Sequence, residues 1–532
     1  MTIKRAGLDS VGQAGVRRHS RRSTLRYAAG VAVGTAATAL LAPFGGQAQT
    51  PRKGGIARIA TEITDATATL DPSLIFTNTD IARGFQIYNG LVRIDEKLAV
   101  QPSLAETWEP AKPDGTEWVF KLRGGVEFHD GKPLTAADVV WNMQRHLGAK
   151  SESRARNLMA AVKEVHADDP LTIRFVLSTP QVEFPAILSF PQLVIAPQGH
   201  QNFLAPIGTG PFRMKEFTPG GASAFVRNAN YWNAGQVHLD GIELVALPDP
   251  TARLNGVLSG DLHFAMTADV TAVPLLDKSR IAEKLYVRAG QCACIALQCD
   301  REPGNNLDLR MALRLLQDRQ RVLDGVYKGF AQVANDHPVS PTDPMYAADL
   351  PIRPYDVDRA KFHLKRAGAD GIAIDIYVAP GIGPGVIDQA LLYQQTAAPA
   401  GVKVNVKQVA GEGYWNTTFR KHPFTAWHLN MRARPDHMWS VTLQTDSVIN
   451  TTSFRDPRID DLLRAARAEF DERKRRQHWH DLQKIVHDDA GYLQPVFPDY
   501  IHAKARSLQG VRAHPTAGLS DFLSGEGWWL AT

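Results

Sequence analysis

The chain has 532 residues, more than one hydrophobic core usually supports, so at least two lobes are expected. Its hydrophobic fraction of 44% and charged fraction of 22% are typical of a soluble globular protein. Residues 1–48 hold seven Lys/Arg and one acid, which leaves 53 basic and 54 acidic residues in the remainder. Without this segment the formal charge falls from +5 to −1, which argues against a nucleic-acid partner.

The first 48 residues have the pattern of an export signal. Arg21 and Arg22 precede an apolar run at 27–41, which is short and rich in Ala and Gly. Gly46 and Ala48 then supply small residues at the two positions that a signal peptidase inspects, so the segment resembles a twin-arginine signal cleaved near Ala48. The weak hydrophobicity disfavours an uncleaved anchor, and a periplasmic location is expected.

Three cysteines, Cys292, Cys294 and Cys299, lie close together in the sequence. In a strand, the first two face one side and the third the other. A disulfide from Cys299 would leave one thiol over, and no histidine lies nearby for a metal site. Buried thiols that act as small apolar residues are the favoured interpretation.

The first half of the chain alternates between strand and helix patterns. Residues 55–60 and 118–122 are typical of strands, and about 80–87 of a helix. Thr135 and Asp138 form a capping-box pattern that opens a further helix.

The second half predicts a strand, a helix and a strand at 372–378, 386–397 and 402–409, which indicates a parallel sheet. Asp456 before Pro457 predicts an N-cap and a helix start. A second helix follows, with Trp479, Leu482, Ile485 and Val486 inward. The fold class is therefore α/β.

Several motifs connect the chain after residue 48 with one known family. In order, they are YNGLV at 88–92, PSLAETW at 102–108, FKLR at 120–123, VEFHDGKPLTAADV at 126–139, GTGPF at 208–212, RNANYW at 227–232 and YDVDRAK at 355–361. This part of the chain resembles the periplasmic substrate-binding proteins of peptide, nickel and opine ABC importers, the extracellular family 5. Each motif also has a structural explanation, so together they indicate fold and family rather than a substrate.

The resemblance implies a two-lobed periplasmic binding protein of the large, peptide-binding-like class II type. After the signal at 1–48, lobe I with an inserted subdomain is expected at 49–299, lobe II at 300–494, and a C-terminal return to lobe I at 495–532. A small solute is enclosed by hinge closure and delivered to an ABC permease in the inner membrane. The expected protein is a monomer without a cofactor, and it is not an enzyme.

The stretch 424–436 is the most informative about the ligand. In peptide-binding relatives, a Trp here is followed three residues later by an Asp that pairs with the peptide ammonium group. This chain keeps the Trp, as Trp427, but carries Asn430 in place of the Asp. An amide cannot neutralise a buried cation. Arg432 and Arg434 could grip a carboxylate or phosphate, or form ordinary salt bridges. Peptides, opines and related solutes all remain open as ligands.

Other ligand contacts are expected from aromatic and polar residues. Trp427 could form an aromatic wall or pack in the core, and Tyr414 and Trp415 could line the same cleft. In the first lobe, Phe76 and Asn78, with Thr77 between them, occupy a loop where relatives contribute contacts. The alternative for each of these residues is an ordinary surface position.

Two other functions compete with solute import. An exported hydrolase lacks support, because no Gly-x-Ser-x-Gly elbow or His-Glu-x-x-His zinc helix is found. A chemosensory binding protein cannot be separated from an importer component by sequence. His478, His480 and His487 are interpreted as a solvated helix face rather than a metal site, because basic residues precede them.

Overall fold

The computed structural model describes residues 50–62, 68–447, 449–517 and 521–531. The expected signal at 1–48 lies outside the described residues. From Pro51 onward the chain forms one compact unit. Within the described ranges, no helix combines the length and the apolar character needed to cross a membrane.

Lobe I is built on a mixed sheet. Among the described residues its seven strands run in the order β12 (Ala282–Val287), β20 (Tyr500–Ala505), β11 (Phe264–Ala265), β1 (Ile56–Thr61), β10 (Gly241–Ala246), β9 (Ser223–Arg227) and β8 (Phe212–Phe217). β1 pairs parallel with β10, with Ile56 opposite Gly241. The strand expected at 55–60 is therefore confirmed as β1.

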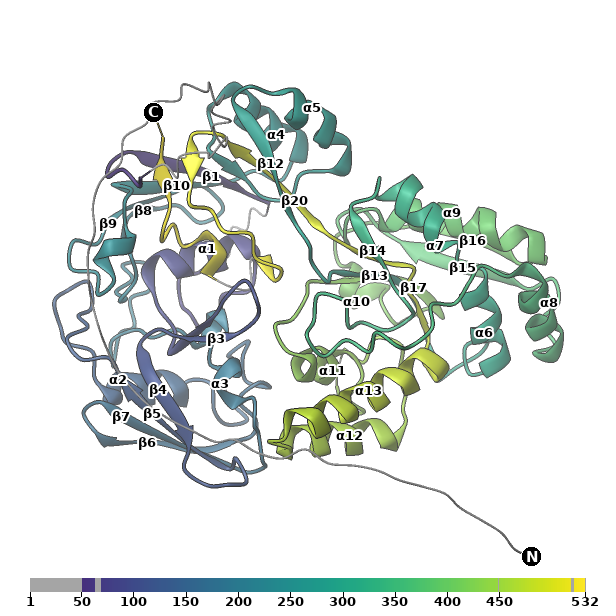
Figure 1. The fold of residues 1–532 in the computed structure, drawn as a ribbon, viewed down its shortest axis with the longest axis horizontal. Coiled ribbons are helices and arrows are strands. Elements are labelled where there is room, and N and C mark those ends of the chain that lie inside the picture. Colours follow the sequence, from purple (N-terminus) through teal and green to yellow (C-terminus); the bar gives the residue numbers. More distant parts are fainter. Residues whose placement is uncertain (1–49, 63–67, 448, 518–520, 532) are drawn as a thin grey trace, which may run out of the picture. The chain divides into compact units, whose positions relative to one another are not determined.

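Smaller sheets complete lobe I. An antiparallel sheet, four-stranded in the described part of the chain, has the order β4 (Ala105–Pro110), β5 (Glu117–Leu122), β7 (Thr172–Leu177) and β6 (Val162–Asp169). Two hairpin pairs are β2 (Val92–Ile94) with β3 (Val100–Pro102), and β21 (Leu508–Gln509) with β22 (Trp529–Leu530). Figure 1 shows β4 to β7 apart from the larger sheet.

The described helices of lobe I are α1 (Asn78–Ile87), α2 (Ala136–Gln144), α3 (Phe184–Ile187), α4 (Pro250–Ser259) and α5 (Val273–Lys278), with short η1 (Pro191–Leu193), η2 (Ala234–Gln236), η3 (Val270–Ala272) and η7 (Asp521–Leu523). Three of them, α1, α2 and α4, begin at a residue whose side chain caps them. At α2 the backbone N–H of Thr135 donates to Asp138 Oδ2 at 2.8 Å, which confirms the predicted capping box.

Lobe II is built on a second mixed sheet. In the described residues its five strands have the order β16 (Lys403–Gln408), β15 (Ala373–Val378), β17 (Phe424–Leu429), β13 (Cys292–Leu297) and β18 (Tyr492–Leu493). β15 and β16 pair in parallel and are joined by α9 (Val386–Ala397), which confirms the predicted strand–helix–strand unit. A separate antiparallel pair joins β14 (Ala331–Val333) to β19 (Val496–Pro498).

Helices surround the lobe II sheet. They are α6 (Leu307–Leu315), α7 (Arg319–Arg321), the π-helical η4 (Val322–Val326), α8 (Val357–Arg366), η5 (Ala398–Ala400), α10 (Tyr414–Thr417), α11 (Pro435–Thr442), α12 (Pro457–Ala468) and α13 (Glu472–Asp489). The Asp456 side chain accepts from the Arg458 N–H at 2.9 Å, so it caps α12 as predicted. His487 on α13 is buried and contacts Arg353, so the expected solvated face is wrong for this residue.

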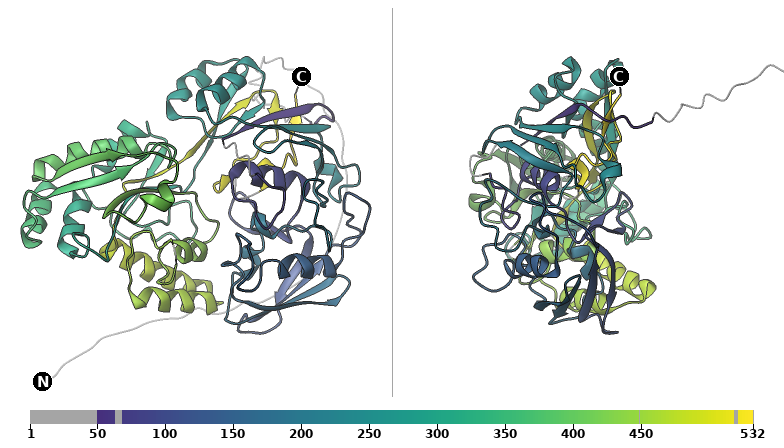
Figure 2. Two further views of the ribbon diagram at one scale, coloured as in Figure 1. Left: turned by 180° about the vertical axis from the view of Figure 1, so that it is seen from behind. Right: turned by 90° about the vertical axis from the view of Figure 1, so that its left-hand side faces the viewer.

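Two connections join the lobes. β12 belongs to lobe I and β13 to lobe II, so the first crossing precedes Cys292 rather than lying near Cys299. β19 pairs in lobe II and β20 in lobe I, which places the second crossing at Asp499, slightly after the expected Gln494–Pro495. Figure 2 shows β20 leading from one lobe into the other.

The cysteines lie on and just after β13. Cys292 and Cys294 are free and buried in the lobe II core, and Cys299 is free and half-buried. Burial raises the pKa of Cys292 to about 12 and that of Cys299 to about 11. The interpretation of these residues as apolar thiols is confirmed for the first two.

Candidate functional site

Two adjoining pockets lie between the lobes. We call the first the Arg432 pocket; it encloses about 590 Å³, part of it open to solvent, and Arg432 and Ala433 line it from lobe II. The second, the Glu183 pocket, spans about 1030 Å³, part of it open to solvent, and is lined by Glu183 from lobe I and Arg434 from lobe II. Phe190 and Ala433 line both pockets, so the two pockets adjoin, and we refer to them together as the cleft.

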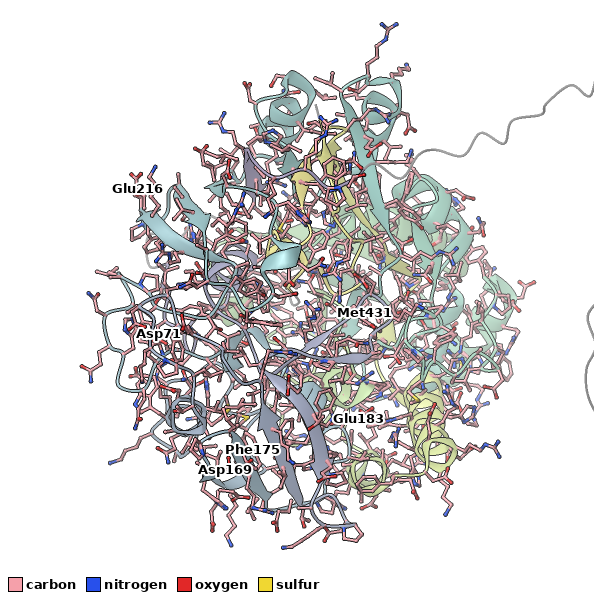
Figure 3. All side chains as sticks on the ribbon, turned by 60° about the vertical axis from the view of Figure 1, so that its left-hand side comes forward. Asp71, Asp169, Phe175, Glu183, Glu216 and Met431 are labelled. Atoms are coloured by element: carbon pink, nitrogen blue, oxygen red, sulfur yellow. The ribbon has the colours of Figure 1, made fainter. Side chains whose placement is uncertain are left out.

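The lobes touch each other around this cleft. Met431 of lobe II is buried among Ile94, Leu98 and Ala186 of lobe I. The rings of Phe190 and His437 meet edge to face, 4.4 Å apart. Figure 3 shows Met431 and Glu183 in the region where the two lobes meet. The two lobes are therefore in direct contact beside the cleft.

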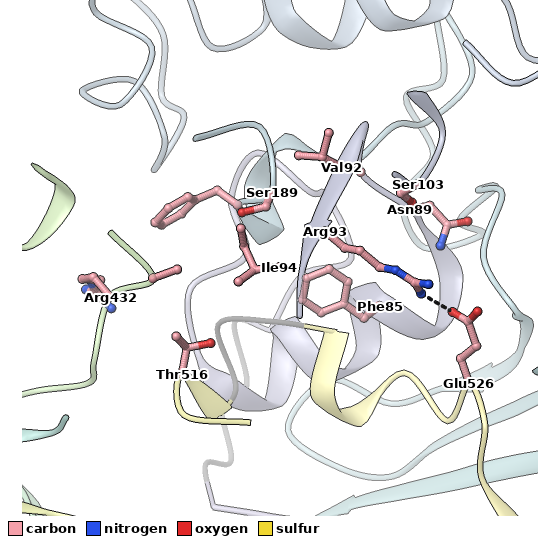
Figure 4. Close-up of a pocket in the computed structure, with 13 residues that line it drawn as sticks. Phe85, Asn89, Val92, Arg93, Ile94, Ser103, Ser189, Arg432, Thr516 and Glu526 are labelled. Carbon is pink, nitrogen blue, oxygen red and sulfur yellow. Dashed lines mark hydrogen bonds and ion pairs between the residues drawn. The ribbon is translucent and has the colours of Figure 1, made fainter. Parts of the chain in front are cut away.

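Arg432 carries a charge into the cleft from lobe II. It lies just past the end of β17, and its Nε is buried without a hydrogen-bond partner among the described residues. Figure 4 shows its side chain on the opposite side of the pocket from the Arg93–Glu526 pair. Burial lowers the pKa of Arg432 to about 10, so the guanidinium stays charged at neutral pH. A ligand acid group could pair with it.

Across the same pocket, lobe I presents charges that are already paired. Arg93 Nη1 lies 3.4 Å from Glu526 Oε2, and this contact is drawn in Figure 4. The Tyr231 hydroxyl donates to Glu526 Oε2 at 3.3 Å, and the Asn233 amide donates to Oε1 at 2.5 Å. The charges on Arg93 and Glu526 balance, so Arg432 leaves the pocket with a net positive charge.

The Asn430 side chain forms a hydrogen bond within the protein. Its Oδ1 accepts a hydrogen bond from the Tyr500 hydroxyl at 3.0 Å. The amide at this position thus binds a neighbouring side chain, and the described contacts place no carboxylate where peptide-binding relatives carry an Asp.

Arg434 lies in the Glu183 pocket beside the carboxylate that gives the pocket its name. Arg434 Nε is 3.8 Å from Glu183 Oε1, and Glu183 Oε2 is buried without a hydrogen-bond partner in the described part of the chain. Burial raises the pKa of Glu183; Arg434 opposes this shift and Asp436 adds to it. Arg434 therefore forms a loose interlobe ion pair, one of the two roles considered from sequence.

The aromatic candidates divide between core and surface. Trp427 is buried in the lobe II core and meets Tyr492 edge to face. Tyr414 is also buried, and its hydroxyl donates to the Ala426 carbonyl at 2.8 Å. Trp415 is half exposed and packs on Phe419. None of the three lines either pocket as described. Trp427 on β17 and Tyr414 on α10 both belong to the lobe II core.

The lobe I candidates lie at the start of α1. Phe76 is 70% exposed, with the Arg154 guanidinium over its ring. Thr77 is the N-cap of α1 and Asn78 its first residue. The described pockets do not include these residues.

Several cleft residues have no counterpart in the sequence-based prediction. Arg93, Glu183, His437 and Glu526 line the cleft from segments far apart in the chain. They match no motif, because their proximity depends on lobe closure and on the return of the C-terminal segment to lobe I. The nearest to a local signal is the charge of Glu183 in the segment that follows β7.

A family model for bacterial extracellular solute-binding proteins, family 5 (the middle region) matches residues 99–450, more than half of the chain. The chain belongs to this family. The matched region includes Glu183, Asn430, Arg432 and Arg434, so most of the charged groups of the cleft come from the shared part of family 5.

Individual family 5 proteins resemble the chain over most of its length. The probable di/tripeptide-binding protein 5 of Pseudomonas aeruginosa (strain UCBPP-PA14) is 27% identical over 475 residues, covering 82% of this chain and 89% of that protein. The DppA periplasmic binding protein of Helicobacter pylori, solved with the peptide STSA, has a TM-score of 0.78 at 23% identity, covering 90% and 99% of the two chains. The binding protein AgaA, solved with agropinic acid (A.tumefacien R10), has a TM-score of 0.76 at 22% identity, covering 90% and 99%. These structures establish the two-lobed α/β fold.

Proposed function

We propose that this protein captures a small solute with a carboxylate or similar acid group between its two lobes and delivers it to an ABC importer. The observation that carries the proposal is Arg432, a charged guanidinium that lines the cleft and has a buried Nε without a partner in the described residues. Burying an unpaired polar group costs about 1–3 kcal/mol, which a ligand acid group would offset.

The contacts between the lobes support capture by hinge motion. Met431 and Arg432 come from lobe II, and Ile94 and Arg93 face them from lobe I, so opening the lobes separates the two walls of the pocket. A solute that contacts both walls favours the closed state over the open one. No chemical step is required for this role, and we propose no catalytic residue.

The relatives support the class of solute. The named ligands of the similar proteins include di- and tripeptides, the peptide STSA and agropinic acid. Peptide-like or opine-like solutes fit a pocket with net positive charge. We propose Arg432 as the primary contact, with Asn430 and Arg434 beside it and Trp427 and Tyr414 supporting the β17 segment.

The remaining parts of the proposal concern organisation and location. We propose that residues 1–48 are a twin-arginine signal, that the protein works as a periplasmic monomer, and that its partner is an inner-membrane ABC permease. The strand pairings support two lobes that meet before Cys292 and at Asp499, with β4 to β7 as the subdomain inserted in lobe I.

Substitution of Arg432 tests the proposal. In isothermal titration calorimetry with a panel of dipeptides and opines, Arg432→Gln should weaken binding by about 10- to 100-fold, the range for charge-assisted hydrogen bonds. Without ligand the variant should melt at the same temperature or higher, because it no longer buries an unpaired charge. Arg359→Gln, on the exposed face of α8, is the matched control. Equal affinity in Arg432→Gln and the native protein would remove Arg432 from the site.

A further inference from the structure

The two connections between the lobes meet at the side chain of Asp499. Asp499 is buried in the second crossing, between β19 of lobe II and β20 of lobe I. In the described residues, three donors bind its carboxylate. The Tyr286 hydroxyl donates to Oδ2 at 2.6 Å, and the Ala289 N–H and Gln332 Nε2 donate to Oδ1 at 2.9 Å and 3.0 Å.

These three donors come from three different parts of the molecule. Tyr286 lies on β12, which pairs with β20 in lobe I. Gln332 lies on β14, which pairs with β19 in lobe II. Ala289 lies in the first crossing, between β12 and β13. Asp499 is therefore bound from lobe I, from lobe II and from the other connection, and we call this residue and its three donors the hinge clasp.

Further hydrogen bonds link the two connections beside the carboxylate. Gln332 Nε2 also donates to the Ala289 carbonyl at 2.7 Å. Gln291, just after the first crossing, donates from its Nε2 to the Asp499 carbonyl at 3.1 Å. The two connections are thus joined through both backbone and side-chain groups, and one cannot bend without displacing groups that bind the other.

The carboxylate is the acceptor on which the clasp depends. Burial raises the pKa of Asp499, whereas the hydrogen bonds of the clasp and the charge of Arg288 oppose this shift. An ionised carboxylate only accepts hydrogen bonds, and such bonds are roughly twice as strong as those between neutral groups. The buried Ala289 N–H is among the donors that would lose their partner if Asp499 moved away.

A pocket beside the clasp leaves room for the lobes to move. It spans about 860 Å³, part of it open to solvent, and Asp499 lines it together with Asp269 of lobe I and Lys328 of lobe II. Because segments of both lobes line this space, a change in the angle between the lobes changes its width. The hydrogen bonds of the clasp, rather than close packing, restrain the hinge on this side.

We infer that Asp499 is a positioning residue for lobe closure, whose carboxylate makes the two connections bend as one unit and narrows the range of angles that the lobes adopt. Asp499 does not line the Arg432 pocket or the Glu183 pocket, so it acts through the hinge rather than on the solute. The inference rests on the hinge motion of the proposed function but not on the proposed solute. A looser hinge populates more open arrangements and so lowers the fraction of protein that is ready to bind.

Hydrogen–deuterium exchange of the ligand-free mature protein tests the inference. Tyr286→Phe removes one donor and leaves the bond between Ala289 and Asp499 in place. Exchange in peptides that span Ala289 and in those that span Asp499 should nevertheless rise by about three- to tenfold, because the bonds of the clasp share one carboxylate and open together. Small-angle X-ray scattering of the same sample should show a larger radius of gyration than the native protein.

Tyr355→Phe is the matched control. Tyr355 is 37% exposed against 38% for Tyr286, and its hydroxyl donates to the Thr396 carbonyl at 2.8 Å within lobe II. This variant should exchange and scatter like the native protein. Absence of either change in Tyr286→Phe would overturn the inference. Faster exchange throughout both lobe cores would also overturn it, because Tyr286 would then support the whole fold. Since no solute is used, these outcomes are separate from those of the Arg432→Gln titration.

Discussion

At the residue scale, burial raises the pKa of acidic side chains near the contact between the lobes. Asp343 is 7% exposed, and the Met345 N–H donates to its Oδ1 at 2.7 Å. Burial raises its pKa to about 7; Glu183 adds to the shift, whereas Arg434 and Arg476 oppose it. The charged form of Asp343 is therefore disfavoured in the folded protein.

Asp343→Asn should stabilise the protein in a defined pH window. Below about pH 4 the carboxyl group is protonated in both the folded and the unfolded protein, so its raised pKa does not change the free energy of unfolding. Its destabilising effect grows as pH rises and is complete above about pH 7. The variant should gain up to about 4 kcal/mol in the free energy of unfolding over this range, since Asn keeps the Oδ1 acceptor.

Urea unfolding of both proteins between pH 4 and pH 8 measures this difference. Asp370→Asn is the control, because Asp370 is an exposed acid of the same lobe. A difference between Asp343→Asn and the native protein that stays constant with pH would contradict the raised pKa.

Single residues also show what the sequence could and could not reveal about the site. The substitution of Asn430 for an acid and the two nearby arginines were visible locally, and Arg432 does line the cleft. Whether Arg434 is paired depends on Glu183, which lies some 250 residues away. Glu526 and Arg93 could not be connected by any pattern, because the C-terminal segment returns to lobe I only in the folded chain.

At the element scale, the segment that follows β7 in lobe I forms hydrogen bonds with helices of lobe II. The Val182 N–H donates to the Arg467 carbonyl at 2.8 Å, and Gln181 donates to Asp436 on α11. Phe470, just after α12, approaches Gly115 of lobe I so closely that a Cβ there would meet its ring at 3.1 Å. Figure 3 shows Glu183 at this junction.

Gln181→Ala should shift the lobes toward the open state. The variant loses one hydrogen bond to a charged group, of about 1.5–3 kcal/mol, which is made only when the lobes are closed. Small-angle X-ray scattering of the ligand-free protein should show a larger radius of gyration for the variant. Gln201→Ala, at an exposed position of lobe I, should scatter like the native protein. Identical curves for all three proteins would show that this contact does not hold the lobes together.

Elements with a strong local pattern were predictable, and those defined by distant pairing were not. β15, α9 and β16 follow from periodicity, and α2 and α12 from their caps. The crossings between lobes were displaced by several residues, because β13 and β19 are assigned to lobe II by strand pairing rather than by composition. Short strands such as β18 carry too few residues for a periodic signal.

At the scale of the whole molecule, two lobes with separate cores meet along a cleft whose unpaired charges come from both sides. The lobe II core and the cores of lobe I contain different residues, whereas Met431 packs into lobe I. Separate cores allow each lobe to move as a unit. Because the contact between the lobes is small, the free-energy difference between the open and closed states is small enough for a ligand's binding energy to shift the equilibrium.

Native mass spectrometry of the mature protein, purified without denaturation, tests most directly whether a solute is held between the lobes. The account predicts one small molecule per chain in the native protein, with an acid group identifiable after release, and a strongly reduced occupancy in Arg432→Gln. Equal occupancy in the two proteins, or a bound molecule without an acid group, would contradict it.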